Sequence, residues 1–226
     1  MKKKILAAFM AAAMVAGMSA INVAAEEEGG DVITVGFSQV GAESDWRTAN
    51  TESMQTTFSE ENGYELIFSD AQQKQENQLT AVRNFIQQEV DYILLAPVTE
   101  TGWDTVLQEA KDAGIPVIIV DRMVDVSDDS LYTTWIGTDS LLEGRKAAEW
   151  LNAYATAKEI APEDLHIVDI QGTIGSTAQI GRTQGLEEGV EKYGWDLLEQ
   201  QSGEFTQAKG QEVMESMLKK YDNINV

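Results

Sequence analysis

The chain has 226 residues, of which 38 are acidic and 16 basic, so its formal charge is −22 at neutral pH. A surface this acidic repels nucleic acid and anionic lipid, and we therefore expect no nucleic-acid partner. The sequence contains no Cys, which excludes disulfides, thiolate metal sites and a lipid anchor on cysteine.

The first 25 residues have the pattern of a secretory signal peptide. Lys2 to Lys4 precede an apolar run from Ile5 to Ala16, and small residues up to Ala25 offer a cleavage site. The apolar run is shorter than the about 20 residues that a membrane span requires. We therefore expect removal of residues 1–25 and a mature, soluble protein of 201 residues that is periplasmic or extracellular.

After the signal peptide, short apolar runs alternate with helical patterns, which is typical of β-α units that build a mostly parallel sheet. The runs predicted as strands are Val32–Phe37, Tyr64–Phe68, Tyr92–Leu95, Val117–Val120, Thr133–Gly137, Leu165–Ile170, Trp195–Leu198 and Ile224–Val226. Core-facing helical stripes lie between them: Leu79, Val82, Phe85 and Ile86; Trp103, Val106, Leu107 and Ala110; and Met214, Met217 and Leu218.

The alternation is interrupted once, by an acidic irregular stretch from Asp121 to Ser130. A new helix is predicted from Leu141 to Tyr154, after Thr138 and Asp139. We therefore predict two Rossmann-like, doubly wound α/β lobes, residues 31–138 and 139–226, with a hinge between them. The chain ends where a strand begins, at Ile224–Val226, so we expect a C-terminally truncated sequence and an incomplete second lobe.

Charged side chains follow the predicted strands, where doubly wound sheets bind their ligands. Glu43, Trp46 and Arg47 follow the first strand, and Asp121 and Arg122 follow the fourth. Carboxylates and guanidinium groups make charge-assisted hydrogen bonds to sugar hydroxyls, and an indole can cover the C–H side of a sugar ring. The alternatives are a capped loop with a half-buried Trp, and an internal ion pair that caps the fourth strand.

The sequence lacks residues that nucleotide binding, triad or zinc catalysis and glycoside hydrolysis would require. The segment Gly172 to Thr177 lacks the spacing of a nucleotide-binding loop, so Ser176 or Thr177 more plausibly caps a helix, and no cofactor is predicted. His166 is the only histidine, which leaves a catalytic triad or a histidine zinc site without partners. Glycoside hydrolysis needs a protonated carboxylic acid, but an arginine beside each candidate carboxylate favours the ionised form.

The chain resembles the type I periplasmic sugar-binding proteins of ABC transporters, in the galactofuranose-binding branch. The similarity covers residues 32–226. It rests on V-G-F-S-Q-V-G-A-E-S-D-W-R (35–47), D-A-Q-Q-K-Q-E-N-Q (70–78), A-P-V-T-E-T-G-W (96–103), V-D-R (120–122), Ile170 to Gly175 and K-G-Q-E-V-M-E-S-M (209–217).

This resemblance implies a binding protein, not an enzyme, that captures a furanose such as galactofuranose for import. It implies hydrogen bonds to the sugar from Glu43, Arg47, Asp121, Arg122 and Arg182, and wall or stacking roles for Trp46 and Phe37. The lobes would close about a hinge near residues 138–139 and present the sugar to a membrane permease. We expect a monomer without metal or cofactor.

The sequence is compatible with two other functions. A sensory module that presents the sugar to a membrane receptor would have the same pocket. A secreted glycosidase would instead release product from a furanoside.

Overall fold

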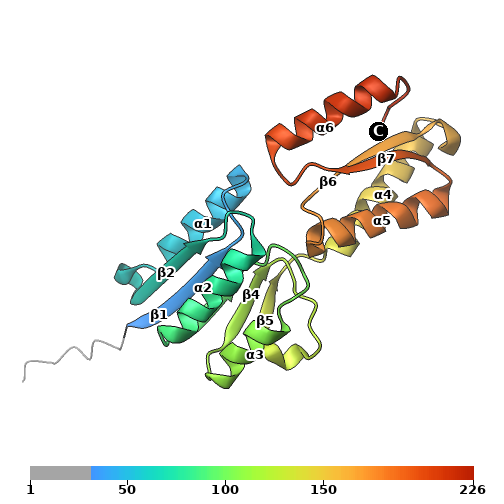
Figure 1. The fold of residues 1–226 in the computed structure, drawn as a ribbon. Helices are drawn as coiled ribbons and strands as arrows, with labels where there is room; N and C mark the ends of the chain where they lie inside the picture. Colours follow the sequence, from blue (N-terminus) through green and yellow to red (C-terminus); the bar gives the residue numbers. More distant parts are fainter. Residues whose placement is uncertain (1–31) are drawn as a thin grey trace, which may run out of the picture. The chain divides into compact units, whose positions relative to one another are not determined.

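The structure is a computed structural model that describes residues 32–226 (Figure 1). The predicted signal peptide lies outside the described residues. The elements in chain order are β1 (Ile33–Gln39), α1 (Asp45–Thr57), η1 (Glu60–Asn62), β2 (Tyr64–Asp70), α2 (Gln75–Gln87), β3 (Tyr92–Leu95), α3 (Asp104–Asp112), β4 (Val117–Asp121), η2 (Asp129–Leu131), β5 (Thr134–Gly137), α4 (Ser140–Ala157), η3 (Pro162–Asp164), β6 (His166–Gln171), α5 (Thr177–Tyr193), β7 (Asp196–Ser202) and α6 (Gln207–Lys220). This alternation confirms the predicted α/β class.

The first sheet contains five parallel strands in the order β2-β1-β3-β4-β5 (Figure 1). The strand order reverses at β1, which pairs with β2 on one side and β3 on the other. Doubly wound sheets bind ligands at the carboxyl ends of the strands, beside such a reversal. The loops that follow β1 and β4 therefore emerge where a ligand site is expected.

Helices cover both faces of this sheet. The predicted stripes on α2 and α3 are confirmed, because Val82, Phe85 and Leu107 are buried in one core cluster with Ile93 and Ile119. The opposite face carries a second cluster around Phe37 and Val120, against which α1 packs with Met54. Apolar cover on both faces explains why the strands read as nearly continuous apolar runs.

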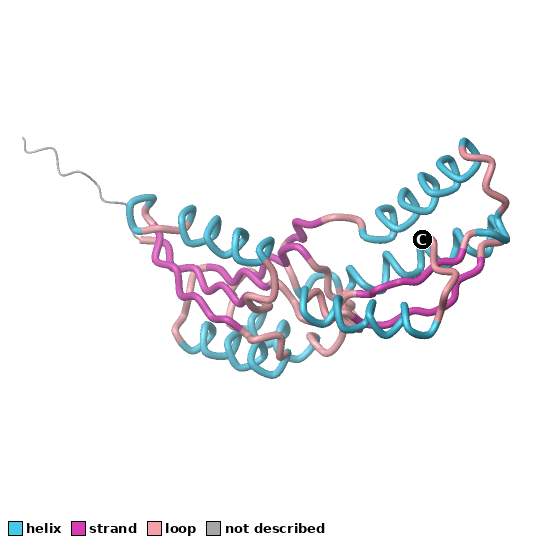
Figure 2. Tube along the Cα trace, turned by 90° about the horizontal axis from the view of Figure 1, so that it is seen from above, coloured by secondary structure: helices cyan, strands magenta, loops and turns pink. Residues whose placement is uncertain are grey.

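The second sheet contains the parallel strands β6 and β7, shown in magenta in Figure 2. Its core cluster joins the strands to α4 and α5. On α6, the predicted stripe is wrong at Leu218, which is 58% exposed. Val213 and Met217 are the buried residues of this helix, because their four-residue spacing places them on one face and Leu218 lies about 100° farther round.

The predicted last strand, Ile224–Val226, is not a strand in the structure. Its backbone nevertheless hydrogen-bonds to β6, since the Val168 N–H donates to the Val226 carbonyl at 3.0 Å. The Asn225 side chain also accepts from the His166 N–H at 2.8 Å.

Helices α4 and α5 approach each other closely through glycines. A Cβ atom added to Gly185 would lie 2.5 Å from the backbone of Gly144 and Arg145, and Gly181 and Gly189 face α4 in the same way. The glycines on α5 repeat every four residues and so share one face of the helix. This close contact sets where α5 presents Arg182.

Gln78 ties α2 to the loop that follows β3. Its side chain is fully buried; Nε2 donates to the Ala96 carbonyl at 2.7 Å, and Oε1 accepts from the Val98 N–H at 2.8 Å. The Val98 carbonyl in turn accepts from Arg122 Nη1 at 3.1 Å. A buried amide thus supports the backbone against which a candidate site residue rests.

Substituting Gly185→Ala should lower the free energy of unfolding by about 1–3 kcal/mol, because the new methyl group overlaps the α4 backbone. The matched control is Gly210→Ala in α6, where no atom lies within 4 Å of the added Cβ. That control should stabilise the protein by about 0.5–1 kcal/mol through better helix propensity. Urea titration measures both variants, and an equal response at the two positions would contradict the close helix contact.

Substituting Gln78→Leu should lower the free energy of unfolding by about 2–4 kcal/mol, because it leaves the Ala96 carbonyl and the Val98 N–H buried without partners. Gln87→Leu, at an exposed position at the end of the same helix, should change the stability by less than about 0.5 kcal/mol. Thermal unfolding of both variants checks the difference. A Gln78 variant as stable as the control would show that its two hydrogen bonds do not support the loop.

Candidate functional site

The candidate site begins at the loop between β1 and α1. Ser44 caps α1 in extended backbone geometry, and its hydroxyl accepts from the Arg47 N–H at 3.2 Å. The cap fixes the first turn of the helix, which carries Trp46 and Arg47. Arg47 is the buried residue of α1, so this helix turns a guanidinium group toward the protein interior.

Arg47 forms the centre of a buried ion-pair network. Its Nε lies 3.2 Å from Glu43 Oε1, and its Nη2 lies 2.8 Å from Asp121 Oδ2 at the end of β4. The side chains of Arg47 and Glu43 are only 3% and 2% exposed. Such burial is tolerated because each charge has an opposite charge within hydrogen-bond distance.

Arg122 adds a second buried guanidinium group to this network. Its Nη2 lies 3.9 Å from Glu43 Oε1, and the Phe205 ring centre lies 5.1 Å from its Cζ. Burial is the main cause that lowers the pKa of Arg122 to about 10, and the nearby positive charge of Arg47 adds to this effect. The group stays protonated at neutral pH, so two cations balance the two carboxylates of Glu43 and Asp121.

The network leaves polar atoms without partners. Glu43 Oε2 and Arg47 Nη1 are buried and have no hydrogen-bond partner among residues 32–226. Burying an unpaired acceptor or donor costs free energy, and most such atoms in folded proteins have partners. The network thus contains one acceptor and one donor that the described chain does not satisfy.

Residues of this network line a cavity of about 300 Å³, which is at the lower end of the size range of small-molecule sites. Its lining residues are Glu43, Ser44, Trp46, Arg47, Asp121, Arg122, Thr138, Glu143, Ala178, Arg182 and Phe205. The structure therefore brings six of the seven predicted site residues together.

Phe37 is the predicted residue that does not reach the cavity. Its side chain is fully buried in the core, and its ring centre lies 5.8 Å from that of Phe68. Successive side chains on a strand point to opposite faces of the sheet, and Phe37 points into the α1-side core rather than beyond the end of β1. A wall or stacking role for Phe37 is not compatible with this position.

Phe205 was missed by sequence reasoning. It follows β7, which ends at Ser202, four residues beyond the predicted end at Leu198, so the predicted strand end does not point to this loop. Glu204 and Phe205 both have positive φ angles, 55° and 57°, which residues with side chains rarely adopt. This backbone conformation directs the Phe205 ring toward Arg122.

Arg182 lines the cavity but is paired and partly exposed. Its Nη2 lies 2.9 Å from Glu143 Oε2 on α4, and its side chain is 48% exposed. Trp46 is also exposed, and its ring centre lies 4.8 Å from the Arg47 guanidinium. These two side chains can therefore reach a ligand from the rim of the cavity.

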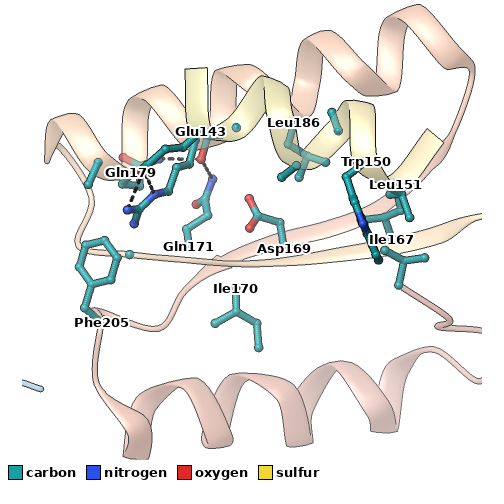
Figure 3. A pocket seen from close by; sticks show the side chains of 18 residues that line it. Glu143, Trp150, Leu151, Ile167, Asp169, Ile170, Gln171, Gln179, Leu186 and Phe205 are labelled. Carbon is teal, nitrogen blue, oxygen red and sulfur yellow. Dashed lines mark hydrogen bonds and ion pairs between the residues drawn. The ribbon is translucent and has the colours of Figure 1, made fainter. Parts of the chain in front are cut away.

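A larger cavity of about 650 Å³ lies beside β6 and shares Glu143, Ala178, Arg182 and Phe205 with the first (Figure 3). Figure 3 shows Asp169 and Gln171 pointing from β6 toward this cavity, whereas Ile170 points to the opposite face. Burial raises the pKa of the Asp169 carboxyl group. Most of the other lining side chains are apolar, and Glu143, Gln179, Arg182 and Thr183 are the further polar ones.

The described residues contain no group of three or more His, Cys, Asp or Glu side chains suited to a metal ion. Within the same part of the chain, no helix combines the length and the apolar character needed to cross a membrane.

Several known proteins are similar to this chain over most of its length, and three of them are described here. The galactofuranose-binding protein YtfQ of Escherichia coli (strain K12) is 45% identical over 212 residues, which are 93% of this chain and 63% of that protein. A solved structure from Mycobacterium smegmatis in complex with β-D-fucofuranose has a TM-score of 0.80 and 47% identity, covering 85% of this chain and 62% of that chain.

The third is the periplasmic binding protein component of the arabinose ABC transporter from Shewanella sp. ANA-3, bound to α- and β-L-arabinofuranose. It has a TM-score of 0.75 and 50% identity, and the match covers 83% of this chain and 60% of that chain. This chain thus spans less than two thirds of the length of these relatives. The family of the periplasmic binding protein domain matches residues 35–226, and the chain belongs to this family.

Proposed function

We propose that this protein binds a monosaccharide in its furanose form in the 300 Å³ cavity and delivers it to the permease of an ABC transporter. The observation that carries the proposal is the pair of buried atoms, Glu43 Oε2 and Arg47 Nη1, that lack partners within the described chain. A sugar hydroxyl can donate to the first atom or accept from the second, and two hydroxyls can satisfy both.

The charge balance of the site favours a neutral, polyhydroxylated ligand. Arg47 and Arg122 already face Glu43 and Asp121, so an anionic ligand would meet two carboxylates and a cationic ligand two guanidinium groups. Hydroxyl groups avoid both repulsions and still gain charge-assisted hydrogen bonds.

We assign the polar contacts to Glu43, Arg47, Asp121, Arg122 and Arg182, and the apolar walls to Trp46 and Phe205. The furanose form is supported by the relatives above, which are named for galactofuranose or have fucofuranose or arabinofuranose bound. The relation to a component of an arabinose ABC transporter supports import over a sensory role.

The same proposal includes two lobes, export and a monomeric protein. The two lobes, residues 31–138 and 139–226, would move about a hinge near Thr138 and Asp139. This position is supported by the end of the first sheet at Gly137 and the start of α4 at Ser140. Residues 1–25 would direct the chain out of the cytoplasm. The charge of −22 disfavours a nucleic-acid partner.

We further propose binding without turnover. Glu43 and Asp121 both accept a hydrogen bond from Arg47, so the network uses them as acceptors within ion pairs and not as a pair of free carboxyl groups. Steady release of nitrophenol from nitrophenyl furanosides would contradict this part of the proposal.

Arg47→Ala and Asp121→Ala should each weaken sugar binding by about 2–4 kcal/mol, because each removes a ligand contact and a charged partner from the buried network. Isothermal calorimetry with galactofuranose, galactopyranose, arabinofuranose and ribose measures the effect. Asp45→Ala removes an exposed carboxylate from the same turn of α1, outside the cavity lining, and should leave the affinity unchanged.

Two results would count against this assignment. Affinity weaker than millimolar for all four sugars would reject the furanose site. Unchanged affinity in the Arg47 or Asp121 variant would remove that residue from the site even if the protein binds a sugar.

A further inference from the structure

Asp121 has an unusual backbone conformation for a residue with a side chain. Its φ angle is 64°, in the left-handed region, although it is the last residue of β4. Its carboxylate lies 2.8 Å from Arg47 and borders the cavity. Non-glycine residues keep such a conformation only where surrounding contacts enforce it, and these positions cluster at functional sites.

Trp135 on β5 supplies such a contact. Its indole Nε1–H donates to the Asp121 carbonyl oxygen at 3.1 Å. In the strand register Trp135 lies opposite Ile119, and Gly137 lies opposite Asp121, so the indole extends two residues along the strand to reach this carbonyl. The indole has one polar group, a donor, and it is used here.

Gly137 makes room for this arrangement. A Cβ atom at this position would lie 2.5 Å from Trp135 Nε1 and 2.7 Å from Cε2, and it would also overlap the Asp121 carbonyl oxygen. The spacing Trp135-Ile136-Gly137 thus lets an indole lie across a position that has no side chain. The rest of the Trp135 side chain packs against the core cluster that contains Ile119, which anchors the donor.

We propose that Trp135 is a positioning residue for ligand binding. It holds the Asp121 carbonyl, and so keeps the left-handed turn that directs the Asp121 carboxylate to Arg47 and the cavity. Trp135 is absent from the cavity lining, so it acts through Asp121 and not on the ligand itself. The affinity part of this inference rests on the proposed sugar-binding function.

The test compares Trp135→Phe with Trp150→Phe. Phenylalanine keeps an aromatic ring at position 135 but removes the N–H donor, whereas Trp150 is 66% exposed and has no contact with the network. The first readout needs no sugar: backbone ¹³C chemical shifts report whether Asp121 remains in the left-handed conformation. We expect the Asp121 signals to move in Trp135→Phe and to stay in place in Trp150→Phe.

The second readout is sugar affinity in two backgrounds. Losing one hydrogen bond should weaken sugar binding by about 3- to 10-fold in Trp135→Phe. When Asp121→Ala is already present, adding Trp135→Phe should not weaken the binding further. If the tryptophan were merely structural, Trp135→Phe would lower the melting temperature in both backgrounds. The sugar affinity would then be the same with and without the substitution. Gly137→Ala retains the tryptophan, but its Cβ would overlap both the indole and the Asp121 carbonyl, so it should change the Asp121 signals and the affinity at least as much.

Unmoved Asp121 signals in both variants, or equal affinity losses with and without Asp121→Ala, would overturn the inference. If the unmodified protein binds none of the sugars, the proposed function fails. The chemical shifts still decide whether Trp135 holds the Asp121 turn.

Discussion

The candidate site depends on one constraint, the burial of the Arg47 guanidinium group. A charge that is 3% exposed must have opposite charges beside it, and Glu43 and Asp121 supply them from the loop after β1 and from the end of β4, at the same edge of the sheet. The Ser44 cap, the end of β4 and the loop held by Gln78 all contribute to this arrangement. The pairing is incomplete, because one oxygen of Glu43 and one nitrogen of Arg47 have no partner among the described residues.

Much of the fold was predictable because it follows from periodicity. The buried strands appear as apolar runs, and the stripes on α2 and α3 have the spacing that a core-facing helix requires. The stripe on α6 was only partly right, because a single turn of apolar residues cannot tell which of two adjacent positions faces the sheet. Val213 and Met217 are buried and Leu218 is exposed. The predicted strand at Ile224–Val226 is present only as hydrogen bonds to β6.

The site was predictable to the extent that charged residues directly follow strands. Glu43 and Arg47 come after β1, Asp121 is the last residue of β4 and Arg122 follows it, and all four line one cavity. Phe37 belongs to the same sequence motif as Glu43 and Arg47, but it lies within β1 and not after it. The alternation of side chains along the strand turns its ring into the core. Phe205 and Trp135 gave no sequence signal, since a backbone φ angle and a hydrogen bond across neighbouring strands depend on the folded arrangement.

In the proposed function, a bound sugar supplies the hydrogen bonds that the unpaired atoms of the buried network lack. A crystal structure of the protein with arabinofuranose or galactofuranose tests it most directly. We expect sugar hydroxyl oxygens within about 2.6–3.2 Å of both Glu43 Oε2 and Arg47 Nη1. A sugar bound elsewhere, or these two atoms bonded to water alone in the presence of bound sugar, would contradict the account.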